Sequence, residues 1–215
     1  MTAPALRIRG VERRFRGGRG VGPIDLELAP AGRLALIGPS GCGKSTLLRV
    51  ITGFERADRG SIEISGVPVD RVPLGRRDVS LVEQHLPLYE HLRGRENVAM
   101  AISGLRLDRA ERRDRVERAL ATAEATELAD RRADTLSGGE RARLCLARVL
   151  ARRPAVALLD EPFSGLDPDR RTRIRTLALD TLTNAGVAVM LVTHDDRDLT
   201  DIDRTMSLTD AGDMQ

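Results

Sequence analysis

A glycine-rich segment, Gly38–Thr46, separates a short apolar run from a stretch whose apolar residues recur at helical spacing. Arg33–Ile37 is suited to a buried strand, and residues 46–51 continue as a helix. The segment fits G-x-x-x-x-G-K-[ST], in which glycines let backbone N–H groups approach phosphate groups at a helix N-terminus. This order of strand, loop and helix predicts an α/β fold that binds a nucleoside triphosphate. An incidental glycine-rich turn is the alternative.

Lys44 is the only lysine of the chain, although the sequence holds 35 basic residues. Arginine supplies the positive charge everywhere else. An ammonium is a compact point charge, whereas a guanidinium is a broad planar fork that a tight loop cannot accommodate. We therefore expect Lys44 to reach the β- and γ-phosphates, and the hydroxyl of Ser45 to ligate Mg²⁺.

Composition excludes several classes of function. The 215 residues suffice for one large domain or a domain with an inserted lobe. A net charge of +3, with arginines interleaved among 32 acidic residues, indicates a solvated mixed-charge surface without a nucleic-acid footprint. Cys42 and Cys145 lack metal-ligand spacing and fit a reducing compartment. The chain has no apolar run of about 20 residues and begins with no signal peptide, so we expect a soluble cytoplasmic protein.

Apolar patterning indicates strands that alternate with helices, which is typical of a largely parallel sheet. Strands are expected within residues 5–37 and over 61–65, 78–83, 155–159, 187–192 and 204–208, and a helix over 169–183.

Residues 95–153 have helical character and are interpreted as a lobe inserted into the sheet. Within it, we expect Glu111 to pair with Arg115 and Asp114 with Arg118 on an exposed helix face.

The apolar run Val156–Leu159 ends in two adjacent carboxylates, Asp160 and Glu161. The C-terminal ends of strands are where α/β sheets bind ligands. Asp160 is suited to hold Mg²⁺ through water, and Glu161 to polarise an attacking water as general base. A helix cap or a surface turn is the alternative.

The segment Leu136–Glu140 precedes a predicted helix over 141–152. Ser137 can cap this helix, while Gly138 and Gly139 expose backbone N–H groups at its positive end. The pattern predicts a second anion site, or else an ordinary helix start.

Six motifs in order resemble the ATPase subunit of ATP-binding cassette (ABC) transporters, over essentially the whole chain. They are GPSGCGKST, Gln84 in Val-Glu-Gln, LSGGE, ALLDEP, Ser164-Gly165-Leu166-Asp167 and Thr193-His194-Asp195. The resemblance implies an α/β P-loop NTPase (RecA-like) core with an N-terminal antiparallel β subdomain and an inserted α-helical subdomain. The implied boundaries are 1–84 and 154–215 for the core and 85–153 for the helical subdomain, with no C-terminal regulatory domain.

The resemblance also implies a role for each motif residue. Phe15 stacks on adenine, unless it belongs to the strand core. Gln84 ligates Mg²⁺ and senses a partner, His194 contacts the γ-phosphate, and Asp167 couples two sites. Glu161, His194, Lys44 and Gln84 are the expected catalytic residues, and Ser45, Gln84 and Asp160 the Mg²⁺ ligands. ATP contacts are implied for Phe15, Gly38, Pro39, Ser40, Gly41, Cys42, Gly43, Lys44, Ser45, Thr46, Asp160, Ser137, Gly138, Gly139 and Asp167.

By the same resemblance, two ATPase subunits form a head-to-tail homodimer or heterodimer. Each ATP lies between the phosphate loop of one subunit and the LSGG segment of the other. Glu140 stands where glutamine is commoner in this signature, a change that many cassettes tolerate.

The motifs look like those of importers for thiamine, iron, sulfate, molybdate or polyamines. This implies separate membrane permease subunits, a solute-binding protein, no nucleic acid, and a place at the cytoplasmic face of the plasma (inner) membrane. An exporter is the first alternative, and a soluble cassette ATPase of DNA repair or translation the second. The sequence does not identify the cargo. We expect the permease to dock on apolar Leu86, Leu88, Tyr89 and Leu92, within residues 85–97. The alternative is that these side chains pack the helical lobe.

Overall fold

The computed structural model describes residues 3–17, 19–85, 87–164 and 166–209. Their contacts divide the chain into two compact units. The first consists of residues 1–81, 155–161 and 186–215, and the second of residues 82–154 and 162–185.

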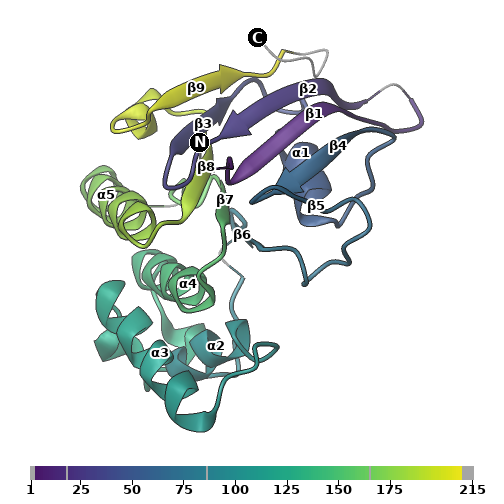
Figure 1. Cartoon of the computed structure of the whole chain (residues 1–215). Helices are drawn as coiled ribbons and strands as arrows, with labels where there is room; N and C mark the ends of the chain where they lie inside the picture. Colours follow the sequence, from purple (N-terminus) through teal and green to yellow (C-terminus); the bar gives the residue numbers. More distant parts are fainter. Residues whose placement is uncertain (1–2, 18, 86, 165, 210–215) are drawn as a thin grey trace. The chain divides into compact units, whose positions relative to one another are not determined.

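An antiparallel sheet forms the N-terminal part of the first unit. It has the strand order β2-β1-β4-β5, in which β1 spans Leu6–Arg14, β2 Gly20–Leu28, β4 Arg59–Ile64 and β5 Val67–Pro68 (Figure 1). Buried and exposed residues alternate along β2 and β4, as expected for strands with one face in the core. The predicted antiparallel β subdomain is confirmed.

A second sheet has the strand order β6-β7-β8-β3-β9. It includes the strands that lie next to the phosphate loop and the acidic pair. It contains β6 (Val79–Val82), β7 (Val156–Asp160), β8 (Ala188–Val192), β3 (Arg33–Ile37) and β9 (Arg204–Ser207). The β7–β8, β8–β3 and β3–β9 pairs are parallel. Every residue of β8 is buried, as continuous apolar runs in parallel sheets predict.

Helix α1, Lys44–Thr52, contributes to the core of the first unit. It contacts β1, β2 and β7 and buries Leu47, Leu48 and Ile51 in a cluster that also contains Leu36 and Met190. The phosphate loop lies between β3 and α1. Both elements contribute residues to this core, so the two ends of the loop are fixed in position.

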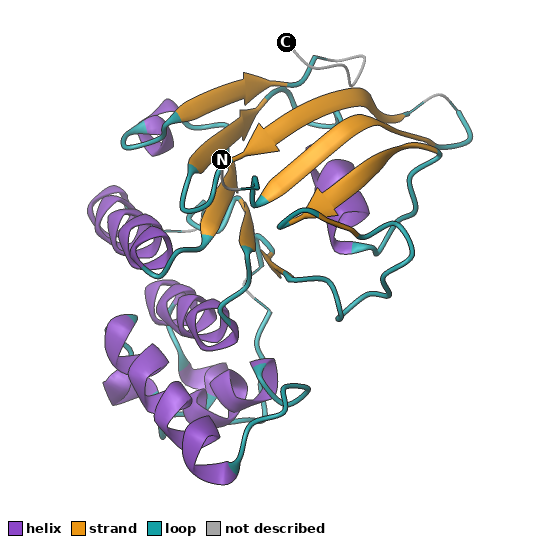
Figure 2. Cartoon of the chain, viewed as in Figure 1, coloured by secondary structure: helices purple, strands orange, loops and turns teal. Residues whose placement is uncertain are grey.

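The second unit is helical (Figure 2). It consists of α2 (Gly94–Ala101), α3 (Arg109–Thr122), α4 (Gly138–Arg152) and α5 (Pro168–Asn184), with short 3₁₀ turns between α3 and α4. Helix α4 contacts each of the other three helices. By its contacts α5 therefore groups with the helical unit, whereas the sequence boundaries placed residues 168–184 in the core.

One of the two predicted helix-surface pairs is wrong. Arg118 pairs with Asp114 as expected. Arg115 instead donates to the backbone carbonyls of Ala151 and Arg152, at 2.5 and 3.0 Å, and Glu111 caps the start of α3 together with Asp108. Carbonyl groups at the end of α4 have no partner within their own helix, so a neighbouring guanidinium binds them in preference to an exposed carboxylate.

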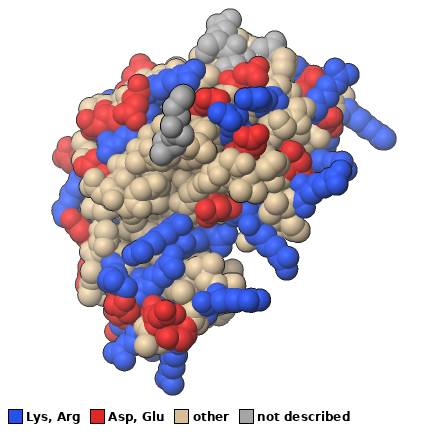
Figure 3. Space-filling view, viewed as in Figure 1, with Lys and Arg blue, Asp and Glu red and all other residues tan. Residues whose placement is uncertain are grey.

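The described surface carries mixed charge. Basic and acidic side chains both occur around the visible face, with a broad area of other residues between them (Figure 3). In the parts of the chain that the structure describes, no helix has the length and apolar character needed to cross a bilayer.

Candidate nucleotide-binding site

Three parallel strands end at the same edge of the second sheet. The register pairs Leu36 of β3 and Asp160 of β7 with the same residue of β8, Val192. The segments that follow these strands are the phosphate loop, Glu161 and Thr193–His194. This edge therefore brings together the first, fourth and sixth sequence motifs, at the position where parallel α/β sheets bind ligands.

The ammonium of Lys44 lies inside its own loop. It donates to the carbonyls of Gly38 and Pro39 at 2.7 and 2.9 Å, and its residue is only 8% exposed. The sulfur of Cys42 lies 3.9 Å from the same nitrogen. The loop backbone thus binds a compact cation through two carbonyl oxygens.

Two glycines of the loop cannot be replaced by other residues without displacing backbone. Gly38 has φ +147°, and a Cβ there would lie 2.5 Å from the carbonyl oxygen of Leu208. Gly43, which precedes α1, has φ +106°, and its Cβ would lie 2.5 Å from the oxygen of Gly20. The loop is thus shaped by close backbone approach, as a phosphate cradle requires.

Ser45 and Asp160 are joined across the edge of the sheet. The Ser45 Oγ lies 3.1 Å from Oδ2 of Asp160. A hydroxyl and a carboxylate are oxygen donors of the kind that Mg²⁺ prefers, usually with several waters retained. This donor pair fits a magnesium ion at the phosphate loop.

Glu161 and His194 are also paired. The His194 Nδ1 lies 3.0 Å from Oε1 of Glu161, and the Glu161 backbone N–H donates to Val192 at 3.1 Å. Glu161 has φ +47°, a left-handed conformation that is costly for a residue with a side chain. Such strain concentrates at functional sites and re-aims a side chain relative to its strand.

A buried hydrogen bond supports the segment that carries His194. The Thr193 hydroxyl donates to the carboxylate of Asp198 at 2.7 Å, and both residues are buried. The Asp195 N–H donates back to the Thr193 hydroxyl at 3.1 Å. These bonds fix the turn after β8.

Phe15 is 38% exposed and does not belong to the strand core. The guanidinium of Arg13 lies 4.7 Å from its ring centroid. Its predicted role in adenine stacking stays a prediction.

In the helical unit, Ser137 is the N-cap of α4 and forms a capping box with Glu140. The Ser137 Oγ accepts from the Glu140 N–H at 3.5 Å, and the Glu140 carboxylate accepts from the Ser137 N–H at 2.8 Å. Arg131 binds the same carboxylate at 2.5 Å. The backbone hydrogen bond from Ser137, followed by those from the Ser137 and Arg131 side chains, lowers the pKa of Glu140.

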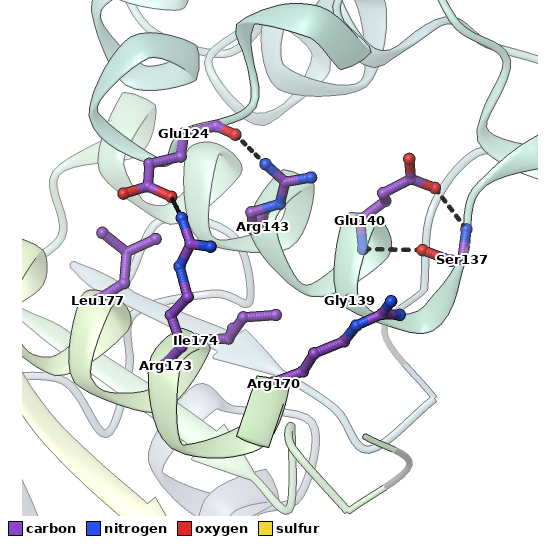
Figure 4. A pocket seen from close by; sticks show the side chains of 9 residues that line it. All are labelled: Glu124, Ser137, Gly139, Glu140, Arg143, Arg170, Arg173, Ile174 and Leu177. Atoms are coloured by element: carbon purple, nitrogen blue, oxygen red, sulfur yellow. Dashed lines mark hydrogen bonds and ion pairs between the residues drawn. The ribbon is translucent and has the colours of Figure 1, made fainter. Parts of the chain in front are cut away.

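A cavity of about 290 Å³ lies beside this helix start (Figure 4). Arg143, Arg170 and Arg173 line it together with Ser137 and Gly139. Arg173 binds the Glu124 carboxylate at 2.7 Å. Because Ser137, Gly139 and Glu140 line the cavity, the N-terminus of α4, which is the positive end of the helix dipole, lies at the cavity.

Gln84 and Asp167 also lie in the helical unit. The Gln84 amide donates to the Ser164 hydroxyl at 3.3 Å. Asp167 caps α5 by accepting from the Arg170 N–H at 3.1 Å, with Pro168 as the first helical residue. Gly165 lies outside the described residues.

In the described part of residues 85–97, where a permease is expected to dock, one of the four leucine and tyrosine residues named for docking is buried. Leu88 is 8% exposed and belongs to the core, while Tyr89 is 44% exposed. The Arg148 guanidinium lies 5.7 Å from the Tyr89 ring centroid, and Arg141 pairs with Glu90 at 2.7 Å. Leu86 lies outside the described residues. An apolar residue type does not distinguish the inward-facing leucine from an outward-facing one.

Sequence reasoning missed the residue that shapes this loop. Asn97 is completely buried, accepts from the Tyr89 N–H at 2.8 Å, and donates to the carbonyls of Tyr89, Leu92 and Arg93. A polar residue on the otherwise apolar face of a short helix was the available signal, because buried amides are found where backbone groups need partners.

Comparisons with known proteins show the family of the chain. The sequence profile described as "ABC transporter" matches residues 21–164. The chain is 38% identical over 192 residues to the putrescine transport ATP-binding protein PotG of Escherichia coli strain K12. It is also 38% identical over 212 residues to the sulfate/thiosulfate import ATP-binding protein CysA of Bordetella pertussis.

These alignments cover 89% and 97% of the chain, but only 51% of PotG and 60% of CysA. Among solved structures, the dimeric bacterial ABC transporter cassette MJ0796 superimposes with a TM-score of 0.84 at 27% identity, covering 98% of this chain and 96% of that one. The profile match and the fold, which has the arrangement of a P-loop ABC ATPase cassette, lead to one assignment. The chain belongs to the ABC transporter family.

Proposed function

We propose that this chain is the ATP-hydrolysing subunit of an ABC importer. The observation that carries the proposal is the contact of two carboxylates at the end of β7 with partners from two other strand ends. Asp160 meets Ser45 of the phosphate loop, and Glu161 meets His194. A nucleotide-binding loop with a cation site and a base beside it has the parts that phosphoryl transfer to water requires.

Each residue has a distinct task in this proposal. Lys44 and the loop N–H groups bind the β- and γ-phosphates of ATP. Ser45, Asp160 and Gln84 would hold Mg²⁺, which would neutralise phosphate charge. Glu161 accepts the proton of the attacking water, and His194 keeps the Glu161 carboxylate oriented and donates toward the γ-phosphate.

Replacing Glu161 with glutamine tests the hydrolytic step. We expect Glu161→Gln to keep ATP affinity and to lower turnover by about a hundredfold or more, as for loss of a general base. Glu27→Gln is the matched control, because Glu27 is an exposed strand residue paired with Arg7. Turnover in Glu161→Gln within a few-fold of the Glu27→Gln value would remove Glu161 from this role.

The partners of the proposed importer are membrane permease subunits, with a solute-binding protein in the same complex. The printed names of PotG and CysA describe transport and import ATP-binding proteins, which supports import over export. In this proposal the chain is held at the cytoplasmic face of the membrane by the permease, and Tyr89 is the contact. Dimer closure on ATP then drives rearrangement of the permease.

Affinity purification from detergent-solubilised membranes tests the partner. We expect the tagged chain to recover a polytopic membrane protein, and Tyr89→Glu to reduce that recovery by about tenfold, the effect of placing a charge at a buried interface core. Met100→Glu is the control, since Met100 on α2 is also 44% exposed. Recovery of ribosomes or nucleic acid would instead support the soluble cassette alternative, and equal losses in both variants would exclude Tyr89 as the contact.

A further inference from the structure

A pocket of about 450 Å³ opens on the first unit, away from the phosphate loop in sequence. It is formed by the residues after α1, the start of β4 and the loop of residues 70–77 that follows β5. Arg56, Arg59 and Arg71 line it, and all three are exposed. Within the described parts of the chain, their side chains have no hydrogen bond or ion pair. Basic side chains also stand out on the side of the space-filling view where β4 and β5 lie (Figure 3).

The carboxylates of the same pocket are already engaged. Glu55 and Asp58 both pair with Arg13, at 3.2 and 2.8 Å, and Asp58 also accepts from the Arg14 N–H at 2.7 Å. Asp70 accepts from the Ile62 N–H at 3.4 Å. Counted with Arg13, the pocket holds five guanidiniums and three carboxylates, so it keeps a net positive charge.

Arg77 lines the pocket as well and keeps its charge, but several of its N–H donors are already bound to backbone carbonyls. It is buried and donates to the carbonyls of Val50, Ile51 and Val72 at 2.8–3.1 Å. It belongs to the framework of the pocket.

Large apolar side chains accompany the free guanidiniums. Phe54 is 61% exposed and lies between Gly53 and Glu55, which both line the pocket. Leu74, another lining residue, is 49% exposed. A ligand that satisfies this surface needs an anionic group and an apolar part directly beside it. Guanidiniums bind phosphate in a bidentate manner, while exposed phenylalanine and leucine insert at the boundary of headgroups and acyl chains.

We propose that this pocket binds the headgroup of an anionic phospholipid. Arg56, Arg59 and Arg71 bind the phosphate, and Phe54 and Leu74 contact the glycerol and the first acyl carbons. The pocket is of the size that small ligands occupy, which favours a headgroup over an extended acidic peptide. The proposal goes beyond ATP hydrolysis and requires no permease.

Vesicle co-sedimentation without nucleotide tests the site. Vesicles of phosphatidylcholine mixed with phosphatidylglycerol are compared with vesicles of phosphatidylcholine alone. Each arginine near an anionic surface contributes about fivefold to binding, so Arg56→Gln/Arg59→Gln/Arg71→Gln is expected to bind the mixed vesicles about a hundredfold more weakly. Phe54→Ser is expected to weaken binding while retaining its salt dependence.

The matched control is Arg106→Gln/Arg109→Gln/Arg113→Gln. These arginines are also exposed and, within the described residues, have no side-chain partner, so the change in net charge is the same. The control is expected to bind mixed vesicles like the unmodified protein. Equal losses in both triple variants would show a general charge effect and overturn the proposal.

Two soluble probes distinguish the other sources of the same chemistry. Glycerol 1-phosphate tests for a free phosphate ligand, and a fluorescent polyglutamate peptide tests for an acidic partner. Tight binding of either probe without binding to mixed vesicles would overturn the lipid assignment. Circular dichroism of the triple variant is expected to match that of the unmodified protein, which checks its fold independently of the proposed ATPase activity.

Discussion

Lys44 is held in a space that its own loop defines. Its ammonium contacts two carbonyl oxygens and a sulfur, and the residue is almost completely buried. A guanidinium is wider and needs in-plane partners, so Lys44→Arg preserves charge but not fit. We expect ATP turnover to fall by about a hundredfold, which is typical for loss of one preorganised donor.

The reverse exchange on the same helix provides the control. Arg49 is exposed in the last turn of α1, so Arg49→Lys is expected to change turnover less than twofold, within the small effects usual for surface substitutions. Nucleotide affinity, turnover and circular dichroism are measured for both variants. Wild-type turnover in a folded Lys44→Arg protein would mean that any cation suffices in the loop.

At the scale of residues, the motifs predicted which residues form the candidate site better than they predicted which side chains contact one another. The pattern around Asp160 and Glu161 indicated a strand end, and the structure adds which partner each carboxylate meets. Leu88 shows the limit of such reasoning. The sequence does not distinguish an apolar loop residue that is buried in the core from one that is exposed to a partner. Tertiary packing determines which of these positions the residue takes.

At the scale of elements, the helix that follows the phosphate loop depends on a residue from another segment. Arg77 donates to the carbonyls of Val50 and Ile51 at the end of α1, and burial lowers the pKa of this guanidinium. Removing it takes a charged donor away from both carbonyls, of which Val50 also accepts from the Gly53 N–H at 3.2 Å. We expect Arg77→Met to lower the free energy of unfolding by about 3 kcal/mol, the range for a charged hydrogen-bond donor at a buried site.

Arg76→Met is the neighbouring control. Arg76 is exposed and, among the described residues, has no side-chain partner, so the change should stay within about 0.5 kcal/mol. Urea unfolding followed by circular dichroism gives both values. Equal stabilities of the two variants would contradict the capping role of Arg77.

The pattern of apolar residues predicted whether most segments are strands or helices. It did not predict which elements pack against one another. Continuous apolar runs gave β3, β7 and β8, because strands buried on both faces leave no other pattern. The grouping of α5 with α4 was not predictable, because an amphipathic helix after a core strand can cover either neighbour. Arg77 and Arg115 gave no signal either, since an arginine that binds carbonyls looks the same in sequence as one that faces solvent.

At the scale of the whole molecule, the two compact units each contain a helix start that suits phosphate. The first has α1 after its glycine loop, and the second has α4 after Ser137. In the proposed head-to-tail dimer these helix starts bind the same ATP from opposite subunits. One chain alone then cannot form a complete ATP site. ATP-dependent dimerisation is therefore the property that tests this proposal.

Ser137→Ala provides the test, carried out in the Glu161→Gln protein so that ATP persists. The change removes a helix cap and, in the proposed dimer, a contact with the γ-phosphate across the interface. Asp108→Ala is a matched control, because Asp108 forms the same type of capping box with Glu111 at the start of α3.

Both substitutions are expected to destabilise the fold by about 1 kcal/mol. Analytical ultracentrifugation with ATP should show a dimer for the Asp108→Ala protein and an at least tenfold weaker dimer for Ser137→Ala, about 1.4 kcal/mol at the interface. Because the two variants lose the same kind of cap, a difference between them measures the contact across the dimer, and equal dimerisation would place the α4 start outside the nucleotide interface.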